Sequence, residues 1–328
     1  MRREIGDGRF VVGTLPPDGV SVIVVPHPGA PDIGSCVAAL RRAVSGVRAE
    51  LIIVADSGGD TVEAAREAAP DARVVKAGDG GGFAACCHAG VAEAKGRWLV
   101  FVNPEAVPAP GSVRALLDCA NAEPQAGIVG GRCVAADGTA DPRSWCGRPG
   151  LWSAFCFGTL LSAIFPGTRW FDPEAPGPWS SEVQQVPVVT GGYLLVSRRA
   201  WEDTGGFDRG FVMYGEDADL CLRAAALGYR PTVTGRAVFR YEGGAQSIGP
   251  DKLAMLFTGK ATLMRRHVGK GAVRLLVLGV FLRSRLSRLM RAPSAEQGGP
   301  AITREDWRRL WELRREWSKG WPPARPQS

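Results

Sequence analysis

The first hundred residues alternate between short apolar runs and longer amphipathic segments. The apolar runs are rich in β-branched residues and predict buried strands over residues 20–25, 50–55, 72–76 and 97–102. Between them, apolar residues at helical spacing predict helices over residues 35–44, 61–69 and 83–94. This alternation is typical of an α/β fold with a parallel sheet and right-handed crossovers.

Polar or glycine-rich residues follow each predicted strand, where open α/β sheets bind ligands. They are Pro26, the run 56–60 that begins at Asp56, the glycine-rich loop 78–82, and Asn103-Pro104-Glu105. Each also has a structural interpretation. Asp56 can form an Asx-type turn, Asp60 can cap the next helix, and Asn-Pro-Glu can be a polar turn. The loop 78–82 lacks the Lys-Ser/Thr of a P-loop, so its similarity to a phosphate cradle is weak.

The second half contains an acidic helix start. Glu216, Asp217 and Asp219 precede apolar residues at helical spacing, and Gly228 supplies a helix stop. Acidic residues in a first turn can simply cap the helix. Crowding also favours a raised pKa for one of the acids, and the glycines at 205 and 206 allow a tight turn or a close approach to a ligand.

Composition narrows the class of protein. The 328 residues suffice for one large domain with an extension, or for two domains, and 45% hydrophobic with 22% charged residues is ordinary for a soluble globular protein. Eight scattered cysteines without a CxxC pair, together with only three histidines, argue against a zinc site and against a disulfide framework. We therefore expect reduced thiols in the cytosol.

Charge is unevenly distributed around the net +7. From Lys252 onward there are 17 basic and 5 acidic residues, whereas the rest of the chain has an acidic excess of 5. Such a basic tail suits an anionic membrane surface or a polyanion. No nucleic acid is expected as a partner, because no nucleic-acid-binding module is recognised.

No apolar segment resembles a signal peptide or a membrane span. The uncharged stretch 149–168 is interrupted by prolines and glycines, and the apolar run 275–282 has eight residues, well short of the roughly 20 that a bilayer requires. We expect a cytoplasmic protein, peripheral on the inner face of the membrane.

The segment GGFDRGFVMYGEDADLCLR at 205–223 resembles the second signature of family 2 glycosyltransferases of the GT-A fold, especially the rhamnosyltransferase-like branch. ELIIVADSGGD, GGGFAACCHAG, VFVNPEAVPAPGSV and VPVVTGGYLLVSRRAWEDTGGFD resemble further segments of that family in the same order. The resemblance implies a mostly parallel sheet flanked by helices, with a C-terminal helical extension. Residues 1–19 would be a leader, 20–247 the GT-A catalytic domain and 248–328 a basic helical extension.

The resemblance implies inverting transfer of a sugar from a dTDP-, UDP- or GDP-linked donor to an acceptor hydroxyl. A lipid-linked saccharide in cell-envelope glycan synthesis is one such acceptor. Asp217 would be the general base, with Glu216 beside it, and Glu105 would hold Mg²⁺ or Mn²⁺. The implied donor-binding residues are Pro26, Asp56, Gly82, Asn103, Gly191 and Gly192, and the implied acceptor side consists of Trp179, Phe207, Tyr214 and Asp219.

Several residues depart from the family pattern. Glu105 stands where the metal motif usually ends in Asp, and Asn103 stands at the first position of that motif. Tyr241 replaces a histidine, and His88 replaces an asparagine. A catalytically degenerate nucleotide-sugar or glycan-binding paralogue is therefore an alternative. A nucleotidyltransferase is another, although the second signature argues against it.

Two aromatic segments have two interpretations each. Residues 151–165, with Trp152, Phe155 and Phe165, either meet the lipid of an acceptor or form a buried helix. Thr303 and Asp306 suggest a capping box, followed by an apolar face of Trp307, Leu310, Trp311 and Trp317. That helix either lies in a membrane interface or packs against the catalytic domain.

Overall fold

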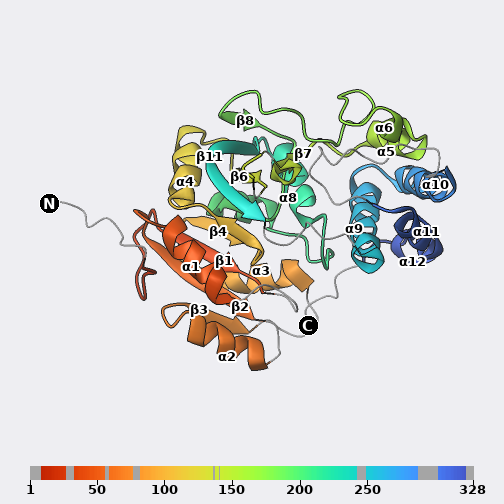
Figure 1. Cartoon of the computed structure of the whole chain (residues 1–328). Helices are drawn as coiled ribbons and strands as arrows, with labels where there is room; N and C mark the ends of the chain where they lie inside the picture. Colours follow the sequence, from red (N-terminus) through yellow and green to blue (C-terminus); the bar gives the residue numbers. More distant parts are fainter. Residues whose placement is uncertain are drawn as a thin grey trace.

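The computed structural model describes residues 9–26, 33–55, 59–76, 82–135, 137–139, 141–241, 249–286 and 302–322. In this part of the chain a nine-stranded sheet lies at the centre of the molecule (Figure 1). Its path is β3-β2-β1-β4-β10-β6-β11-β5, with β8 paired to β11. These strands are β1 (Val20–Val24), β2 (Ala49–Ala55), β3 (Arg73–Lys76), β4 (Trp98–Val102), β5 (Ala106–Pro108), β6 (Ile128–Val134), β8 (Val183–Gln185), β10 (Tyr193–Ser197) and β11 (Thr232–Tyr241). A separate pair consists of β7 (Trp145–Cys146) and β9 (Val188–Val189).

Helices cover both faces of the sheet, and a helical group lies to one side, at the right of Figure 1. One face packs against α1 (Ile33–Ala43), α2 (Gly59–Ala68) and α4 (Ser112–Ala122). The other packs against α3 (Gly82–Glu93), α7 (Arg198–Thr204) and α8 (Glu216–Ala226). The remaining helical elements are η1 (Pro142–Ser144), α5 (Leu151–Gly158), α6 (Leu161–Ile164), α9 (Pro250–His267), α10 (Lys270–Leu286), α11 (Arg304–Glu312) and α12 (Arg314–Trp317).

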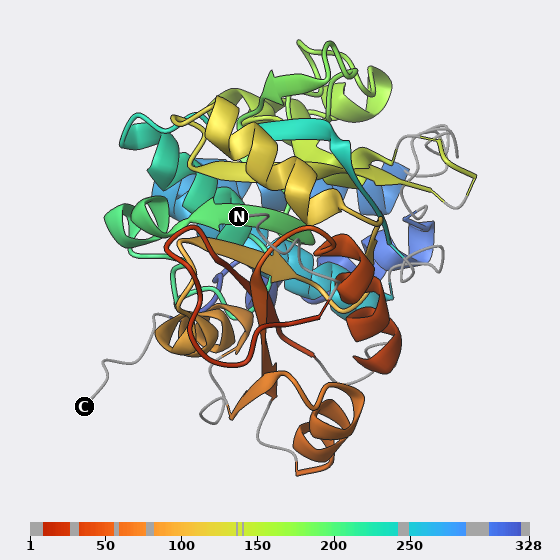
Figure 2. The ribbon, with the colours of Figure 1, turned by 90° about the vertical axis from the view of Figure 1, so that its left-hand side faces the viewer.

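The four predicted strands form the parallel part of the sheet. β1 lies between β2 and β4, with Val20 opposite both Ala49 and Trp98. Side chains of β1 alternate between the two cores, since Val22 belongs to one and Ile23 to the other. β10 runs antiparallel to both β4 and β6, so the far half of the sheet is mixed (Figure 2). The prediction of a mostly parallel α/β sheet flanked by helices is confirmed.

The C-terminal helices α9 to α12 surround a hydrophobic core of their own. Leu310 and Trp317 are buried in it, and Trp317 Nε1 donates to the Leu310 carbonyl at 2.8 Å. The capping box of Thr303 and Asp306 begins α11 as predicted. The apolar face of this helix packs within the protein, because its Leu310 and Trp317 side chains face inward. The helix packs mainly on α9 and α10, whereas the sequence suggested the catalytic domain.

Two buried residues lie across the predicted domain limits, each in the core of a neighbouring predicted domain. α5 lies within the predicted catalytic segment, yet its Ala154 is buried in the core of the C-terminal helices. Phe10, in the predicted leader, is buried in the main core beneath the guanidinium of Arg41. Across the described ranges, no helix combines the length and apolar character needed to cross a membrane.

Candidate active site

A sharp turn brings the acidic residues to the start of α8. Tyr214 and Gly215 have φ angles of 64° and 95°, so two successive residues adopt the left-handed conformation. That conformation is unfavourable for a tyrosine, and backbone strain of this kind is concentrated at functional sites. The turn positions Glu216 and Asp217 as the first two residues of α8.

Hydrogen bonds connect Asp217 to the carboxyl end of β4. Asp217 Oδ2 accepts from the Gly191 backbone N–H at 2.7 Å, and Asp217 Oδ1 accepts from the Ala218 N–H at 2.7 Å. The carbonyl of Gly192 accepts from the Asn103 N–H at 3.0 Å. Asn103 Oδ1 in turn accepts from the backbone N–H of residue 105 at 3.0 Å. The segments 103–105, 191–192 and 216–217 are therefore brought together at one edge of the sheet.

The two adjacent carboxyl groups have unequal surroundings. Burial, together with the charges of Asp217 and Asp219, raises the pKa of Glu216 to about 8. Burial also raises the pKa of Asp217, but the N–H groups of Ala218 and Gly191 stabilise its charged form. At neutral pH the pair therefore keeps its proton on Glu216 and its negative charge on Asp217. Among the described residues, buried Glu216 Oε2 has no hydrogen-bond partner.

The charge of Glu105 acts on two tyrosines of this region. Burial is the main cause of the raised pKa of both Tyr214 and Tyr241, and the negative charge of Glu105 is the second cause. The Tyr241 ring packs so closely on Gly192 that a Cβ there would lie 2.6 Å from a ring carbon. The guanidinium of Arg143 lies 4.8 Å from the centre of the Tyr241 ring. Tyr241 is thus a protonated phenol at the border of the site, where it is a poor metal ligand.

The described residues offer a divalent cation few ligands. They contain no group of three or more His, Cys, Asp or Glu side chains arranged to hold a metal ion. Mg²⁺ often binds through one or two carboxylates while substrate phosphates complete its shell. Glu105, near Tyr214 and Tyr241, fits that arrangement. The described residues do not form a site in which protein side chains alone would surround the metal ion.

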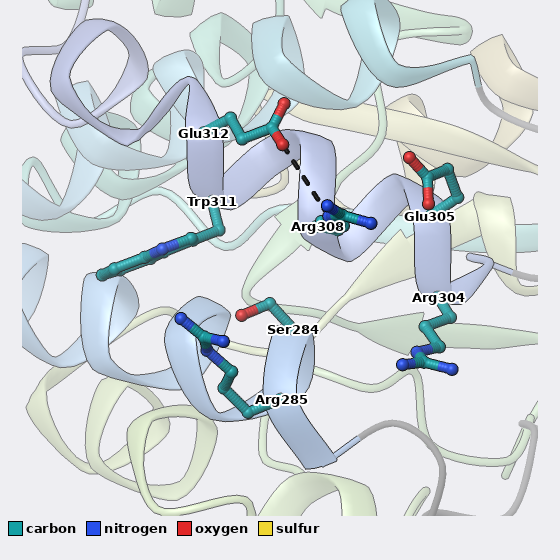
Figure 3. A pocket seen from close by; sticks show the side chains of 7 residues that line it. All are labelled: Ser284, Arg285, Arg304, Glu305, Arg308, Trp311 and Glu312. Atoms are coloured by element: carbon teal, nitrogen blue, oxygen red, sulfur yellow. Dashed lines mark ion pairs between the residues drawn. The ribbon is translucent and has the colours of Figure 1, made fainter.

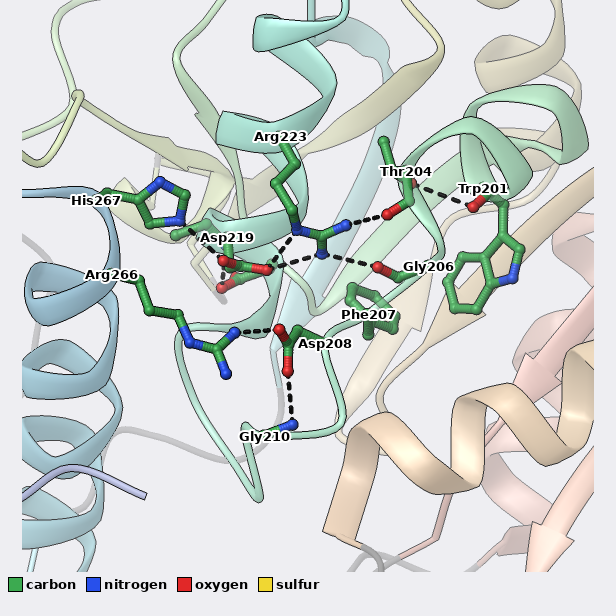
Figure 4. Close-up of polar contacts among 12 residues, drawn as sticks. Trp201, Thr204, Gly206, Phe207, Asp208, Gly210, Asp219, Arg223, Arg266 and His267 are labelled. Carbon is green, nitrogen blue, oxygen red and sulfur yellow. Dashed lines mark hydrogen bonds and ion pairs between the residues drawn. The ribbon is translucent and has the colours of Figure 1, made fainter. Parts of the chain in front are cut away.

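Helix α9 supports this site through a buried ionic network (Figure 4). Asp219 Oδ1 accepts from His267 Nε2 at 2.8 Å, and its Oδ2 accepts from Arg223 at 2.7 Å. Arg223 also donates to the Gly206 carbonyl at 2.7 Å. Asp219 is 1% exposed and has both oxygens occupied. The prediction that Asp219 lines the acceptor side is therefore wrong: it links α8 to α9.

The loop before α8 is held from the same direction. Arg266 forms an ion pair with Asp208 and lies over the Phe211 ring at 4.9 Å. Trp321 Nε1 donates to the Met213 carbonyl at 3.0 Å. A Cβ on Gly259 would lie 2.1 Å from the Tyr214 carbonyl oxygen, so α9 touches the strained turn directly. The C-terminal extension is therefore part of the structure that shapes the site.

Phe207 is a core residue and does not border a ligand. It is 1% exposed and packs against Phe101 and Trp201, with ring centroids 5.2 and 5.3 Å away. His88 Nε2 donates to its carbonyl at 2.7 Å, so the substituted histidine also has a structural contact. The prediction of an acceptor role for Phe207 is wrong, because its ring completes the core beneath the sheet.

The other predicted residues have mixed outcomes. Pro26 is buried just beyond β1. Gly82 has a φ of 67° and lies against Val212. Trp179 is half-buried, with the Arg132 guanidinium 5.5 Å from its ring. Asp56 lies outside the described residues. Roles in donor or acceptor binding for these residues stay predictions.

Sequence reasoning missed His267, Arg266 and Gly259. All three lie on α9, at least 40 residues beyond Asp219, and only the folded chain brings them to the acidic motif. The one available signal was the scarcity of histidine, of which the chain has three.

Comparisons with known proteins agree with the fold and the family resemblance. The sequence model of glycosyl transferase family 2 matches residues 21–204. An N-acetylglucosaminyl-diphospho-decaprenol L-rhamnosyltransferase of Mycobacterium tuberculosis is 28% identical over 225 residues, which cover 65% of this chain and 72% of that protein.

Solved structures share the fold. A mannosyltransferase from Pyrobaculum calidifontis in complex with GDP-Man and Mn²⁺ matches with a TM-score of 0.51 and 17% identity, over 93% of this chain and 84% of that one. GalNAc-T7 with UDP, GalNAc and Mn²⁺ matches with a TM-score of 0.50 and 12% identity, over 76% of this chain and 51% of that one. The family match covers more than half of the chain, which therefore belongs to glycosyl transferase family 2 and is a glycosyltransferase of the GT-A fold.

Proposed function

We propose that this glycosyltransferase inverts configuration and uses Asp217 as its general base. The observation that carries the proposal is the position of Asp217, a half-buried carboxylate fixed by two backbone N–H groups. Its neighbours at the end of β4 include Asn103 and Glu105. A base on one side and a leaving-group site on the other is what a single in-line displacement needs.

In this reaction Asp217 accepts the proton of the acceptor hydroxyl. The hydroxyl oxygen forms a bond to the anomeric carbon, and the bond from that carbon to the diphosphate oxygen breaks. Glu216 stays neutral and does not add a second charge beside the base. Its Oε2 is buried and has no partner in the described part of the chain.

The leaving nucleoside diphosphate lies, in this proposal, near Glu105. A bound Mg²⁺ or Mn²⁺ would neutralise charge that develops on the diphosphate, with Glu105 as its protein ligand. The proposed donor site consists of Pro26, Asp56, Gly82, Asn103, Gly191 and Gly192. Because Phe207 and Asp219 have structural roles, the proposed acceptor-side residues are Trp179 and Tyr214.

The relatives suggest the substrate classes. The mycobacterial relative acts, by its name, on a decaprenol-linked N-acetylglucosamine, which supports a lipid-linked saccharide as acceptor. GDP-Man or UDP with Mn²⁺ in the structural relatives supports a nucleotide-sugar donor. We place the protein in the cytoplasm, on the inner face of the membrane. None of the eight cysteines forms a disulfide within the described residues.

One observation favours a second candidate, a nucleotide-sugar-binding protein without transferase activity. Tyr241 stands where the family usually places a histidine, and its pKa is raised by burial, so it does not replace a metal-binding imidazole. Such a protein would bind donor but release no nucleoside diphosphate.

The test measures nucleoside diphosphate release from dTDP-, UDP- and GDP-sugars, with a membrane extract as acceptor source, in Mn²⁺ and in EDTA. We expect release with one donor class, loss in EDTA and recovery on adding Mn²⁺. Glu105→Gln should raise the Mn²⁺ concentration for half-maximal rate about tenfold, because a neutral amide is a weaker ligand for a hard cation. Glu123→Gln, at an exposed position, is the matched control. Donor binding without release by the wild type would favour the binding protein.

A further inference from the structure

Large apolar side chains gather on the outer surface of α5, α6 and the segment that follows. We call them the aromatic patch, which consists of Leu151, Trp152, Phe155, Ile164, Phe165 and Trp170. Trp170 is 75% exposed, Leu151 62% and Ile164 61%. The inner side of α5 is buried, with Ala154 and Cys156 fully covered. Single exposed apolar residues are ordinary, whereas a group of this size marks an interaction site.

Local contacts hold the patch together. Trp152 stacks on Phe155 with ring centroids 5.4 Å apart, and its Nε1 donates to the Trp170 carbonyl at 2.6 Å. Phe165 packs on Phe171 at 5.0 Å. These contacts fix the exposed rings in a defined arrangement and connect α5 to residue 170.

A buried arginine connects α10 to the two helices of the patch. Buried Arg283 of α10 donates to the Phe157 carbonyl at 2.7 Å and to Ser162 Oγ at 3.1 Å, which ties α10 to α5 and α6. Ser284 and Arg285, which directly follow Arg283 on α10, and the facing side of α11 enclose a hollow of about 710 Å³ (Figure 3). Its lining consists of Ser284, Arg285, Arg304, Glu305, Arg308, Trp311 and Glu312. Arg169, beside Trp170, is exposed as well.

We propose that the aromatic patch and the arginines of the α10–α11 hollow dock the protein onto an anionic lipid bilayer. The chain from Lys252 onward carries 12 more basic than acidic residues, which complements a negatively charged surface. Tryptophan prefers the boundary between lipid headgroups and acyl chains, and arginine binds phosphate. A second copy of this chain that docked through the same surface would bring the same basic excess against it.

The patch is also connected to the proposed base through the paired strands β7 and β9. α5 begins five residues after Cys146, the last residue of β7, and β7 pairs with β9. Gly191, which donates to Asp217, follows β9 by two residues. Docking through the patch would hold a lipid-linked acceptor near Asp217 while its lipid stays in the bilayer. This benefit rests on the proposed function, whereas docking itself does not.

The experiment is co-sedimentation of the full chain with phosphatidylcholine vesicles and with phosphatidylcholine–phosphatidylglycerol vesicles. The aromatic variant is Phe165→Ser with Trp170→Ser, and the arginine variant is Arg304→Gln with Arg308→Gln. Leu227→Ser removes an exposed leucine at the end of α8 and is the matched control. Circular dichroism and thermal melting establish that each variant is folded.

We expect the wild type to bind the anionic vesicles much more tightly than the neutral ones. The aromatic variant should bind the anionic vesicles about 100-fold more weakly than the wild type. The arginine variant should bind them about 30-fold more weakly at low salt, and at high salt it should bind nearly as well as the wild type, because salt screens the charges. The control should match the wild type. Equal binding to both vesicle types, or unchanged binding by both variants, would overturn the proposal.

Two further readouts separate the alternatives. If the aromatic variant converts a dimer to a monomer without losing vesicle binding, the patch contacts a second copy and the proposal fails. Slow hydrolysis of the nucleotide sugar by water tests the transferase chemistry without a membrane. Hydrolysis without vesicle binding would overturn docking alone, and vesicle binding without hydrolysis or transfer would overturn the proposed function alone.

Discussion

The proton held by Glu216 makes a measurable prediction about stability. In the folded chain the pKa of Glu216 is raised to about 8 from an ordinary 4.5. Between these values the folded state keeps a proton that the unfolded state has lost. The folded state binds more protons there, so the free energy of unfolding falls as pH rises.

Glu216→Gln removes this titration while it preserves the size and hydrogen-bonding shape of the side chain. Each unit of pKa difference corresponds to about 1.4 kcal/mol, so from pH 5 to pH 8 the wild type should lose about 3 kcal/mol relative to the variant. Any fixed effect of the amide is the same at every pH and cancels from this difference. Below pH 4.5 both states are protonated and the difference should become constant.

The assay is urea unfolding of both proteins at pH 5, 6, 7 and 8, followed by tryptophan fluorescence and circular dichroism. Glu123→Gln, at an exposed position, is the control and should track the wild type. If the difference between wild type and Glu216→Gln stays constant across this range, Glu216 is not the protonated member of the pair and the reasoning is refuted.

Two further predictions concern the support that α9 gives to the site. Gly259→Ala should reduce both Tm and turnover, because its Cβ would lie 2.1 Å from the Tyr214 carbonyl oxygen. The control is Gly271→Ala, which should leave both unchanged because nothing lies within 4 Å of its Cβ. Equal behaviour of the two variants would contradict the contact between α9 and the turn. His267→Ala should destabilise the fold by about 1–3 kcal/mol in urea unfolding, because Asp219 would lose one partner of a buried charge. A His267→Ala variant with wild-type stability would show that Asp219 does not depend on this bond.

Local patterns were sufficient for the first half of the fold. The strands over 20–25 and 50–55 are short runs rich in β-branched residues, and such runs become buried parallel strands when helices cover both faces of the sheet. Position after a strand also identified Asn103, since the carboxyl ends of parallel strands meet at one edge. The acidic start of α8 was readable because the motif is continuous in sequence.

Long-range packing explains the errors. Asp219 and Asp217 differ by two positions on one helix, and nothing local indicates that the first is enclosed by His267 while the second faces the site. Phe207 has the character of a ligand-binding aromatic in sequence, but its environment is set by Trp201 and the sheet. The tail helix was ambiguous for the same reason, since its apolar face suits a membrane or a protein core equally well.

The central claim is that the carboxylate of Asp217 removes the acceptor proton. The most direct measurement is turnover by Asp217→Asn, which keeps an acceptor atom for the Gly191 N–H but has no basic oxygen. With donor affinity measured separately, we expect turnover to fall at least about 100-fold while donor binding and Tm stay near those of the wild type. Turnover equal to that of the wild type would contradict the account.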